Sequence, residues 1–427
     1  MLNWIGNHKI GIIGDANSGK TVLLTSLLWN LETGNLALGK KGAKPTSIEV
    51  CKLKNGTPEH CFNYADNKLK LKLNNDWPDK TFGDYSLAQC SYDLPDYSLR
   101  HKVTFVDIPG ERLADVAIWE CSSYSNWSEL ILNQWEASEI YSECLADFMA
   151  LLDNPQSTWE KLIWAFKRGM RNLEYRYVCQ ISPSTLFFDQ GKMVSEEELA
   201  NDTWLQERAI WQGGDFFPLP VKWKKENKAI YSECEKHYKA YRKNVIHPIF
   251  SQIGSCDNFI YCVDLFAILV SGPSAFTRTQ EEIASFVNKV VPGAIKYFFK
   301  GKLGGNPRKI AFVATKSDTV YGENLEKLGN LLKDLTQGYD QGEKLPFGYF
   351  ACTAWKSTKL TKTGIPVGRI GDGQWTELAT RDLPEAFPEN WNPEDFQYLA
   401  TPIKPAKAGA KPPKQSGLDE ILTYVTA

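Results

Sequence analysis

The first residues whose types and spacing could do chemistry form a glycine-rich run near the start of the chain. The run is Gly14-Asp15-Ala16-Asn17-Ser18-Gly19-Lys20-Thr21, a complete G-x-x-x-x-G-K-[ST] motif, and a helical pattern begins after it at Val22. The glycines let the backbone curl so that its N–H groups and the helix N-terminus face a phosphate. We expect Lys20 to bridge the terminal phosphates as a catalytic residue and Thr21 to bind Mg²⁺. The run from Gly14 to Val22 is therefore a candidate nucleotide-binding site.

A second candidate motif follows the apolar run Val103–Val106 and reads Asp107-Ile108-Pro109-Gly110-Glu111, a D-x-x-G pattern. We expect Asp107 to hold Mg²⁺ through water and the Gly110 N–H to bind the γ-phosphate. Glu111 stands where many GTPases carry a glutamine that positions the attacking water. Its carboxylate could orient or deprotonate that water if it turns inward, or it could be a solvated side chain. Glu111 is therefore a candidate catalytic residue with an alternative left open.

A third motif, Thr315-Lys316-Ser317-Asp318, follows the apolar run Ile310–Ala314 and has the form T-K-x-D. The Asp318 carboxylate can accept from the N1–H and the exocyclic amine of guanine, and the Lys316 stem can cover the base. Adenine would leave that carboxylate unpaired, so the motif favours GTP and GDP over ATP. Thr315 replaces the commoner asparagine, which predicts a weaker link to the glycine-rich run. Thr353 and Ala354, after the next apolar run, are candidates for a backbone contact to the guanine oxygen.

Short β-branched and aromatic runs alternate with helical patterns around these motifs. Each motif directly follows such a run, so each is expected where a strand ends. The alternation is typical of an α/β domain with a mostly parallel sheet and helices on both faces, here a P-loop GTPase domain. The expected strands are Lys9–Ile13, Val103–Val106, Asn258–Val263, Lys309–Ala314 and Gly348–Cys352, and the expected helices are Val22–Leu31, Thr279–Val290, Glu326–Leu335 and Gly417–Val425.

The middle of the chain, residues 113–254, has a different pattern. It contains 8 of the 14 tryptophans and few strand-like runs. Apolar residues recur at spacings of three and four in Leu162–Tyr177 and in Tyr231–Val245, which indicates amphipathic helices packed on a core. We therefore expect a large α-helical insertion over residues 113–254, within a GTPase domain formed by residues 1–112 and 255–427.

Composition excludes several classes of protein. The chain has 427 residues, of which 43% are hydrophobic, and its 49 basic and 51 acidic residues give a net charge of −2. A folded protein is expected, without the basic field that would drive it onto nucleic acid. The ten cysteines include no C-x-x-C pair, and no run of about 18 apolar residues is present. These features, with no room for a signal peptide before Lys9, predict a cytoplasmic protein.

The order of motifs along nearly the whole chain resembles that of the YcjX-like bacterial stress proteins. The resemblance implies a GTP-binding, GTP-hydrolysing α/β domain with a large helical insertion, in a cytoplasmic protein linked to stress. It also implies that Thr81 is a Mg²⁺ ligand in the first switch, with Thr46 and Thr57 as competitors. The residues that carry the resemblance are Asp107–Glu111, Gly214-Asp215-Phe216-Phe217-Pro218-Leu219-Pro220, Asp264-Leu265, Gly272-Pro273-Ser274-Ala275-Phe276, Thr315–Asp318 and, around Thr81, Trp77–Gly83.

These observations favour a molecular switch that binds and hydrolyses GTP. Because the insertion begins just after Gly110, it is expected to relay the nucleotide state to a protein partner. A GTP-binding scaffold with negligible turnover is an alternative, and a P-loop kinase is a weaker one, since no Arg-rich lid is evident. Membrane association through apolar Phe216–Pro220 and the nearby lysines 222, 224 and 225 is less favoured than a buried apolar turn.

Asn17 stands fourth in the glycine-rich run, where potassium-activated GTPases of the tRNA-modifying type carry an asparagine. In those proteins its side-chain oxygen helps to hold a monovalent cation against the phosphates. The resemblance makes K⁺ a candidate cofactor beside Mg²⁺, and Asn17 a candidate catalytic residue. The alternative is that asparagine merely tolerates the backbone conformation of the loop.

Overall fold

The computed structural model describes most of the chain. Outside the described residues lie 1–4, 40–41, 51–59, 75, 79–82, 96–99, 178–180, 190–191, 194, 291–307, 321, 323, 340–344, 364, 372–373, 379–381, 407, 410 and 413.

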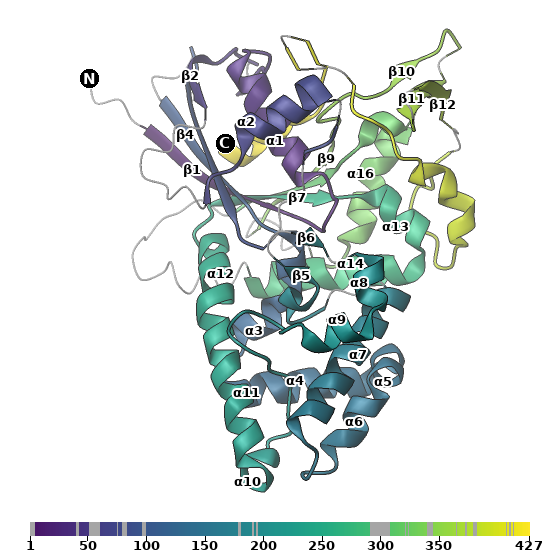
Figure 1. Cartoon of the computed structure of the whole chain (residues 1–427). Coiled ribbons are helices and arrows are strands. Elements are labelled where there is room, and N and C mark those ends of the chain that lie inside the picture. Colours follow the sequence, from purple (N-terminus) through teal and green to yellow (C-terminus); the bar gives the residue numbers. More distant parts are fainter. Residues whose placement is uncertain are drawn as a thin grey trace. The chain divides into compact units, whose positions relative to one another are not determined.

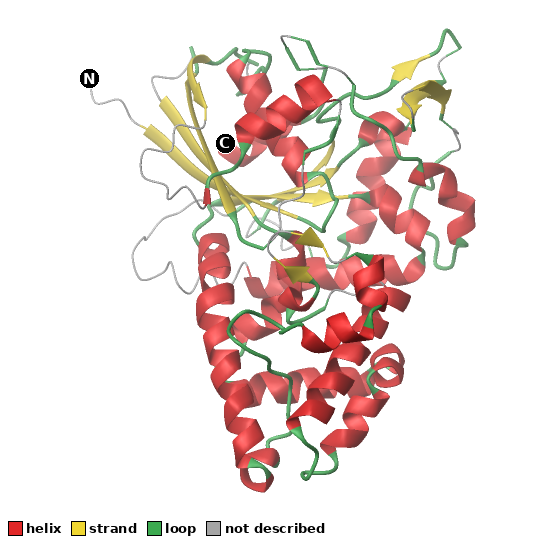
Figure 2. Cartoon of the chain, in the orientation of Figure 1, coloured by secondary structure: helices red, strands yellow, loops and turns green. Residues whose placement is uncertain are grey.

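The chain divides into two compact units. One comprises Met1–Thr81, Tyr85–Gly110 and Gln252–Ala427, and the other comprises Phe82–Asp84 and Glu111–Ser251. We call the first the α/β unit and the second the helical unit, because the described residues of the second form helices apart from one short strand pair (Figure 2). The expected insertion began at residue 113. In the structure Glu111 and Arg112 already belong to the helical unit, as does the short segment around Gly83.

Seven strands of the described α/β unit form one mostly parallel sheet in the order β2-β3-β4-β1-β7-β8-β9 (Figure 1). The five expected strands are present, and the alternation of strands and helices along the chain follows the expected pattern. β2 and β3 were not expected, and β3 runs antiparallel to both of its neighbours, β2 and β4. The strands are β1 (Ile5–Ile13), β2 (Thr46–Val50), β3 (Ser86–Asp93), β4 (Arg100–Asp107), β7 (Asn258–Val263), β8 (Ile310–Ala314) and β9 (Phe347–Ala351).

Strand β1 lies in the middle of the sheet, where the order in which the chain adds strands changes from one side of β1 to the other. It runs parallel to β4 on one side and to β7 on the other. The chain first builds the β2, β3 and β4 side and later adds β7, β8 and β9 on the opposite side. In open α/β sheets, ligands bind at the carboxyl ends of the strands at such a reversal. The end of β1, where the glycine-rich run begins, is therefore the favoured place for a ligand.

Helices cover both faces of this sheet, as expected from the sequence. On one face, α1 (Lys20–Glu32) and α17 (Leu418–Thr426) bury a core against alternate strand residues, among them Ile10 and Ile12. On the other face, Phe259 and Tyr261 contact Phe286 with ring centroids 5.1 and 5.6 Å apart. The alternation of buried side chains between the two faces follows the period of two of a strand.

The remaining described elements of the α/β unit surround this sheet or follow it. A separate three-stranded antiparallel sheet lies between β9 and α17 in the sequence. These elements are α2 (Tyr64–Leu69), the π-helical turn η2 (Lys70–Asn74), α13 (Leu265–Ser271), α14 (Pro273–Ser285), the π-helical turn η6 (Phe286–Val290), η7 (Ser317–Thr319), α16 (Asn324–Leu335), β10 (Lys359–Leu360), β11 (Pro366–Ile370), β12 (Gln374–Glu377) and η9 (Pro393–Ala400).

The helical unit is built on an aromatic core. Trp127 lies with its ring centroid 5.1 Å from that of Tyr238 and 5.6 Å from that of Phe216, and all three side chains are buried. Its elements are η3 (Gly110–Asp115), α3 (Val116–Glu120), α4 (Tyr124–Ala137), α5 (Glu139–Cys144), α6 (Ala146–Leu152), α7 (Trp159–Tyr177), η4 (Ser184–Leu186), β5 (Phe188–Asp189), β6 (Lys192–Met193), α8 (Glu196–Ala200), α9 (Asp202–Glu207), α10 (Trp223–Glu226), α11 (Lys228–Tyr241), η5 (Arg242–Ile246) and most of α12 (His247–Gly254).

The apolar segment Phe216–Pro220 belongs to this core. Phe216, Phe217 and Leu219 are all 0% exposed, and the Tyr124 hydroxyl donates to the Phe217 carbonyl oxygen at 2.6 Å. The aromatic and aliphatic side chains of the segment are thus used inside the protein and are not available to a membrane surface. None of the described helices has the length and apolar character needed to cross a bilayer.

Candidate nucleotide-binding site

The glycine-rich run forms the loop between β1 and α1, and its backbone depends on residues that accept a left-handed conformation. Gly14 has φ 137°, and a Cβ added there would lie 2.1 Å from the Cys262 carbonyl oxygen. Gly19 has φ 86° immediately before α1, and Asn17 has φ 67°. A non-glycine residue at Gly14 would collide with β7, while asparagine is one of the few other residues that adopt this region readily. The residue types of the motif therefore explain the shape of the loop.

Lys20 opens helix α1 and lies over the loop. Its ammonium group donates to the carbonyl oxygens of Gly14 and Asp15, each at 2.7 Å, and the side chain is buried. The Ser18 N–H donates back to the Asp15 carbonyl oxygen at 3.2 Å. The first turn of α1 holds no acidic residue, and its N-cap residue, Gly19, has no side chain that could cap it. A buried ammonium beside an uncapped helix start is an arrangement suited to an anion.

The D-x-x-G motif packs directly on this loop. Asp107 ends β4, is fully buried and lies in register with Ile12 of β1, two residues before Gly14. A Cβ added to Gly110 would lie 2.5 Å from the Gly14 carbonyl oxygen and 2.6 Å from the Ala16 nitrogen. Only glycine allows this approach of two backbones. The structure thus brings Asp107 and Gly110 to the glycine-rich run, as the sequence predicts.

Thr315 joins the third motif to the same loop. Its hydroxyl donates to the Ser18 carbonyl oxygen at 2.8 Å. A Cβ added to Gly19 would lie 3.4 Å from the Cβ of Thr315. The Thr315 N–H donates to the Val263 carbonyl oxygen at 3.1 Å, which fixes the residue at the end of β7 as well. The link to the glycine-rich run is therefore made by the hydroxyl of Thr315, although the residue is not the commoner asparagine.

Asp318 is held by backbone and side-chain donors of a segment that follows β9. The Ser357 N–H donates to Asp318 Oδ2 at 2.7 Å, and the Thr358 hydroxyl donates to the Asp318 carbonyl oxygen at 2.6 Å. Burial raises the pKa of the Asp318 carboxyl to about 6, although the Ser357 hydrogen bond opposes this shift. The sequence did not point to Ser357, because a backbone N–H carries no residue-specific signal.

Lys316, Thr353 and Ala354 complete this part of the site. Lys316 has φ 59° and its ammonium group forms an ion pair with Asp264, whose Oδ1 also accepts from the Ala267 N–H at the start of α13. Ser317 Oγ lies 2.8 Å from Thr353 Oγ1, and the Ser26 hydroxyl of α1 donates to the Ala354 carbonyl oxygen. The Thr353 N–H is used by the Ser416 carbonyl oxygen at 3.0 Å, which leaves Ala354 as the better candidate for a backbone contact to a base.

Of the candidate Mg²⁺ ligands, Thr21 and Asp107 lie at the glycine-rich run. The side-chain oxygens of Thr21 and Asp107 belong to the loop and to the strand beside it, and oxygens are the donors that Mg²⁺ prefers. Thr57 and Thr81 lie outside the described residues. Thr46 of β2 pairs with Asp93 of β3, and Asp93 pairs with Arg100 of β4. Arg100 and Asp107 are at opposite ends of β4, about 23 Å apart at 3.3 Å per residue. Thr46 is therefore excluded as a partner of Asp107. Within the described residues, no three His, Cys, Asp or Glu gather as a metal site.

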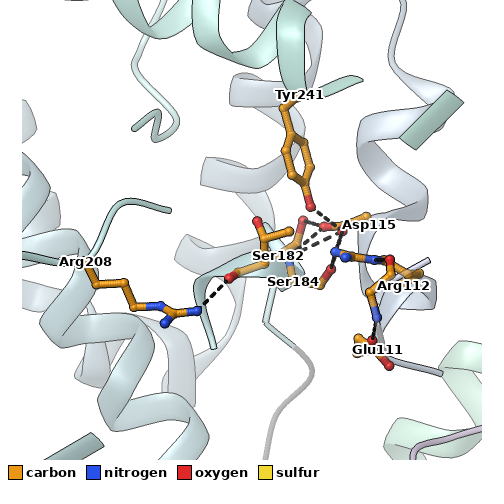
Figure 3. Close-up of polar contacts among 9 residues, drawn as sticks. Glu111, Arg112, Asp115, Ser182, Ser184, Arg208 and Tyr241 are labelled. Atoms are coloured by element: carbon orange, nitrogen blue, oxygen red, sulfur yellow. Dashed lines mark hydrogen bonds and ion pairs between the residues drawn. The ribbon is translucent and has the colours of Figure 1, made fainter. Parts of the chain in front are cut away.

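Glu111 is buried within the helical unit. Its side chain is 4% exposed, and Oε1 accepts from the Gly83 N–H at 2.9 Å. The next residue, Arg112, donates from Nε to the Gly83 carbonyl oxygen at 2.8 Å. The interpretation of Glu111 as a solvated side chain is therefore wrong. Its carboxylate belongs to a polar cluster that Figure 3 shows.

Helix α14 brings charged residues to the loop that the sequence did not single out. Arg278 Nη2 lies 3.9 Å from Asp15 Oδ2, and Arg278 Nε lies 3.4 Å from Glu282 Oε1. Burial, and then the nearby Asp15 carboxylate, raise the pKa of Glu282 well above its usual range. The signal available in the sequence was an Arg and a Glu four residues apart on a predicted helix, which is common on any solvated surface.

A comparison with known families identifies the family that the sequence resembles. The model of the YcjX-like family, DUF463, matches residues 8–427, which is nearly the whole chain. No protein among those with curated functions matches the chain.

Proposed function

Since the chain belongs to the YcjX-like family, a family for which the match itself names no activity, we propose from its site that the protein binds GTP and hydrolyses it as a molecular switch. The observation that carries the proposal is the hydrogen bond from the Thr315 hydroxyl to the Ser18 carbonyl oxygen at 2.8 Å. It joins a candidate base-reading loop to a candidate phosphate-binding loop. One nucleotide could therefore occupy both.

The choice of guanine rests on the chemistry of Asp318. An ionised carboxylate accepts from two donors side by side, which guanine offers at N1 and its exocyclic amine and which adenine lacks. The Ser357 N–H holds Asp318 Oδ2 at 2.7 Å and so fixes the orientation of the carboxyl group. Leaving such a buried acceptor unsatisfied is costly, which supports discrimination against ATP. The same argument disfavours a kinase that uses ATP.

The proposed hydrolysis relies on charge neutralisation around the phosphates. Lys20 and the backbone N–H groups of the loop would bind the β- and γ-phosphates, and the Gly110 N–H would bind the γ-phosphate. Thr21 and Asp107 would hold Mg²⁺, which neutralises the charge that develops on the phosphate oxygens. The Glu111 carboxylate would orient the attacking water. Thr81 remains a proposed Mg²⁺ ligand that enters from the first switch.

A phosphate-release assay on the purified protein tests turnover directly. We expect GTP-dependent release that the Lys20→Ala variant lacks, and no comparable release from ATP. Turnover equal in the wild type and in Lys20→Ala would contradict hydrolysis at this site.

A change of base preference tests the assignment of Asp318. The Asp318→Asn variant replaces one acceptor oxygen by an amide donor, which suits the carbonyl that xanthine carries in place of the amine of guanine. We expect this variant to lose affinity for GDP and to gain affinity for xanthosine diphosphate. The Asp264→Asn variant is the matched control, because it changes a nearby carboxylate that pairs with Lys316 and caps α13 but is not the proposed acceptor for the base. Unchanged preference in Asp318→Asn would refute the guanine assignment.

A GTP-binding scaffold with negligible turnover is a second candidate, and one contact favours it. Glu111 Oε1 is occupied by the Gly83 N–H, so the candidate base already has a partner. The scaffold predicts tight binding of GTP with no phosphate release above that of Lys20→Ala. Under either candidate we propose that the protein acts in the cytoplasm, and that the helical unit binds a protein partner whose affinity depends on the nucleotide, which fits a stress-response role.

A further inference from the structure

Gly83 is held at both of its backbone polar groups by two consecutive residues. Its N–H donates to Glu111 Oε1 at 2.9 Å, and its carbonyl oxygen accepts from Arg112 Nε at 2.8 Å. Gly83 has φ 84°, and a Cβ added there would meet nothing within 4 Å. These two hydrogen bonds hold the backbone of Gly83 at both of its polar groups. We call this arrangement the Gly83 clamp.

Arg112 is fixed in turn by a buried polar cluster around Asp115 (Figure 3). Arg112 Nη1 donates to Ser184 Oγ at 2.6 Å and lies 3.9 Å from Asp115 Oδ2. Asp115 is fully buried and also accepts from the Ser182 hydroxyl at 2.8 Å and from the Ser184 hydroxyl at 2.6 Å. Arg208 donates to the Leu186 carbonyl oxygen at 2.6 Å and so steadies the turn that carries Ser184. The clamp is thus backed by a buried carboxylate and its donors.

Tyr241 connects this cluster to helix α11. Its hydroxyl donates to Asp115 Oδ2 at 2.8 Å. The helix continues directly into the π-helical turn η5, where Arg242 donates to the carbonyl oxygens of Ile118 and Trp119, each at 3.1 Å. One continuous run of helix therefore contacts the segment that follows Gly110 at Asp115, Ile118 and Trp119. π-Helical turns are rare in proteins, and those that occur are often found at functional sites.

We infer that the Arg112–Asp115 pair is the joint through which the helical unit positions Gly83 and Glu111, so that GTP turnover and the state of helix α11 are coupled. The inference rests on the proposed GTPase function, because it gives Glu111 and the segment around Gly83 their roles. Arg112 and Asp115 are positioning residues that act through Glu111 and Gly83. A partner that shifts helix α11 would alter the geometry of the Gly83 clamp, and therefore the rate of hydrolysis.

The physical basis of this coupling is the cost of a buried charge that loses its partners. Displacing Arg112 removes the counter-charge of Asp115, and displacing Tyr241 removes one of its donors. Either loss is expensive in a fully buried site, so the cluster favours a few discrete arrangements over gradual deformation. An element with discrete arrangements that two sites both contact is what coupling between those sites requires.

Steady-state kinetics test the positioning role. We expect kcat for GTP to fall by about 10- to 100-fold in Arg112→Ala, a loss typical of misplaced catalytic groups. In Tyr241→Phe the fall is smaller, and the Kd for GDP is unchanged in both variants. Tyr231→Phe is the matched control, since it removes a hydroxyl from the same helix without touching Asp115, and it should keep the wild-type kcat. The effects of Arg112→Ala and Tyr241→Phe should also be less than additive in the double variant.

Melting temperatures and near-UV circular dichroism establish that each variant is folded. If Arg112→Ala does not fold, Tyr241→Phe and Ser184→Ala carry the same test with milder changes. An unchanged kcat in folded Tyr241→Phe and Ser184→Ala would overturn the inference.

Hydrogen exchange with GDP and with a non-hydrolysable GTP analogue tests the coupling to α11. In the wild type, exchange should differ between the two nucleotides over residues 107–121 and 228–246. In Tyr241→Phe the difference over 228–246 should vanish while that over 107–112 persists. A persistent difference over 228–246 in Tyr241→Phe would overturn the inference and leave the proposed switch intact. No difference anywhere in the wild type, together with no hydrolysis, would refute the proposed function itself.

Discussion

The hydroxyl of Thr315 donates to the backbone carbonyl of Ser18, 297 residues earlier in the chain, across 2.8 Å. Both residues are buried. This bond makes the loop after β8 and the loop after β1 parts of one site, although the two strands are not neighbours in the sheet order. A ligand that contacts both loops gains from their being fixed relative to each other before it binds.

Removing this bond should weaken nucleotide binding. Thr315→Val keeps the shape of the side chain and leaves the Ser18 carbonyl without the hydroxyl donor. We expect the Kd for GDP to rise about fivefold to tenfold, which corresponds to the net contribution of about 1 kcal/mol of one buried hydrogen bond. Thr315→Ser retains the hydroxyl and should bind within about twofold of the wild type. Fluorescence titration with a labelled GDP measures both, and equal weakening by valine and serine would contradict the role of the hydroxyl.

The affinity for GDP should depend on the ionisation of Asp318. Because burial raises the pKa of its carboxyl to about 6, the group loses its charge as the pH falls through this value. A protonated carboxyl cannot accept two hydrogen bonds from guanine at once. We expect the Kd for GDP to be constant between pH 7 and 8 and to rise below pH 6 by about tenfold per unit. The Asp318→Asn variant should lack this dependence, and an equally steep rise in that variant would assign the titration to another group.

The same carboxyl should affect stability in the opposite sense. Its pKa in the folded protein lies above its ordinary value, so the folded chain binds this proton more tightly than the unfolded chain. This group therefore adds to the free energy of unfolding as the pH falls from about 6 to about 4. Urea unfolding of the wild type and of Asp318→Asn at several pH values separates this contribution from those of other carboxyl groups, and parallel pH profiles would contradict it.

Gly110 should not tolerate a side chain. A Cβ there would lie 2.5 Å from the Gly14 carbonyl oxygen, and both partners are backbone, so the loop would have to move. We expect Gly110→Ala to weaken the binding of GTP analogues more than that of GDP, because the Gly110 N–H is the proposed γ-phosphate contact. Gly329→Ala in α16 is the control, since nothing lies within 4 Å of its added Cβ, and it should stabilise the protein by about 0.5 to 1 kcal/mol. Equal loss for both nucleotides in Gly110→Ala would argue against a specific γ-phosphate contact.

The parallel strands and the three motifs could be predicted from the sequence because their signals are local. Strands buried on both faces read as short continuous apolar runs, and each motif stands directly after one. β3 (Ser86–Asp93) was missed because polar residues interrupt its apolar residues, so it does not read as a short continuous apolar run. Its partner β2 is largely exposed at the sheet edge, where propensity is a weak guide.

The contacts that define the site could not be predicted because they join distant residues through backbone atoms. The Ser357 N–H and the Gly83 N–H and carbonyl are backbone groups. Almost every residue carries such groups, so no residue type marks the ones that will form these contacts. The cluster around Asp115 combines residues 112, 184 and 241, which the helical pattern alone does not bring together. Periodicity indicated that the insertion is helical, and it carried no information on which polar side chains the packing would bury.

Asn17 provides the last prediction, because its backbone and its side chain can be separated by mutation. Its φ of 67° shows that asparagine here meets a conformational demand, which is the alternative to a role in K⁺ binding. Asn17→Ala would combine the loss of the side-chain amide with a strained backbone, whereas Asn17→Gly keeps the conformation and removes the side chain with its oxygen.

If a monovalent cation supports hydrolysis, replacing NaCl by KCl at constant ionic strength should raise the GTPase rate of the wild type severalfold. A cation at this position would neutralise charge as the γ-phosphate departs, as an arginine does in other GTPases. Asn17→Gly should hydrolyse GTP at one rate in both salts and still bind GDP. Equal rates of the wild type in the two salts would exclude K⁺ as a cofactor, and a K⁺ response retained in Asn17→Gly would place the cation on other residues.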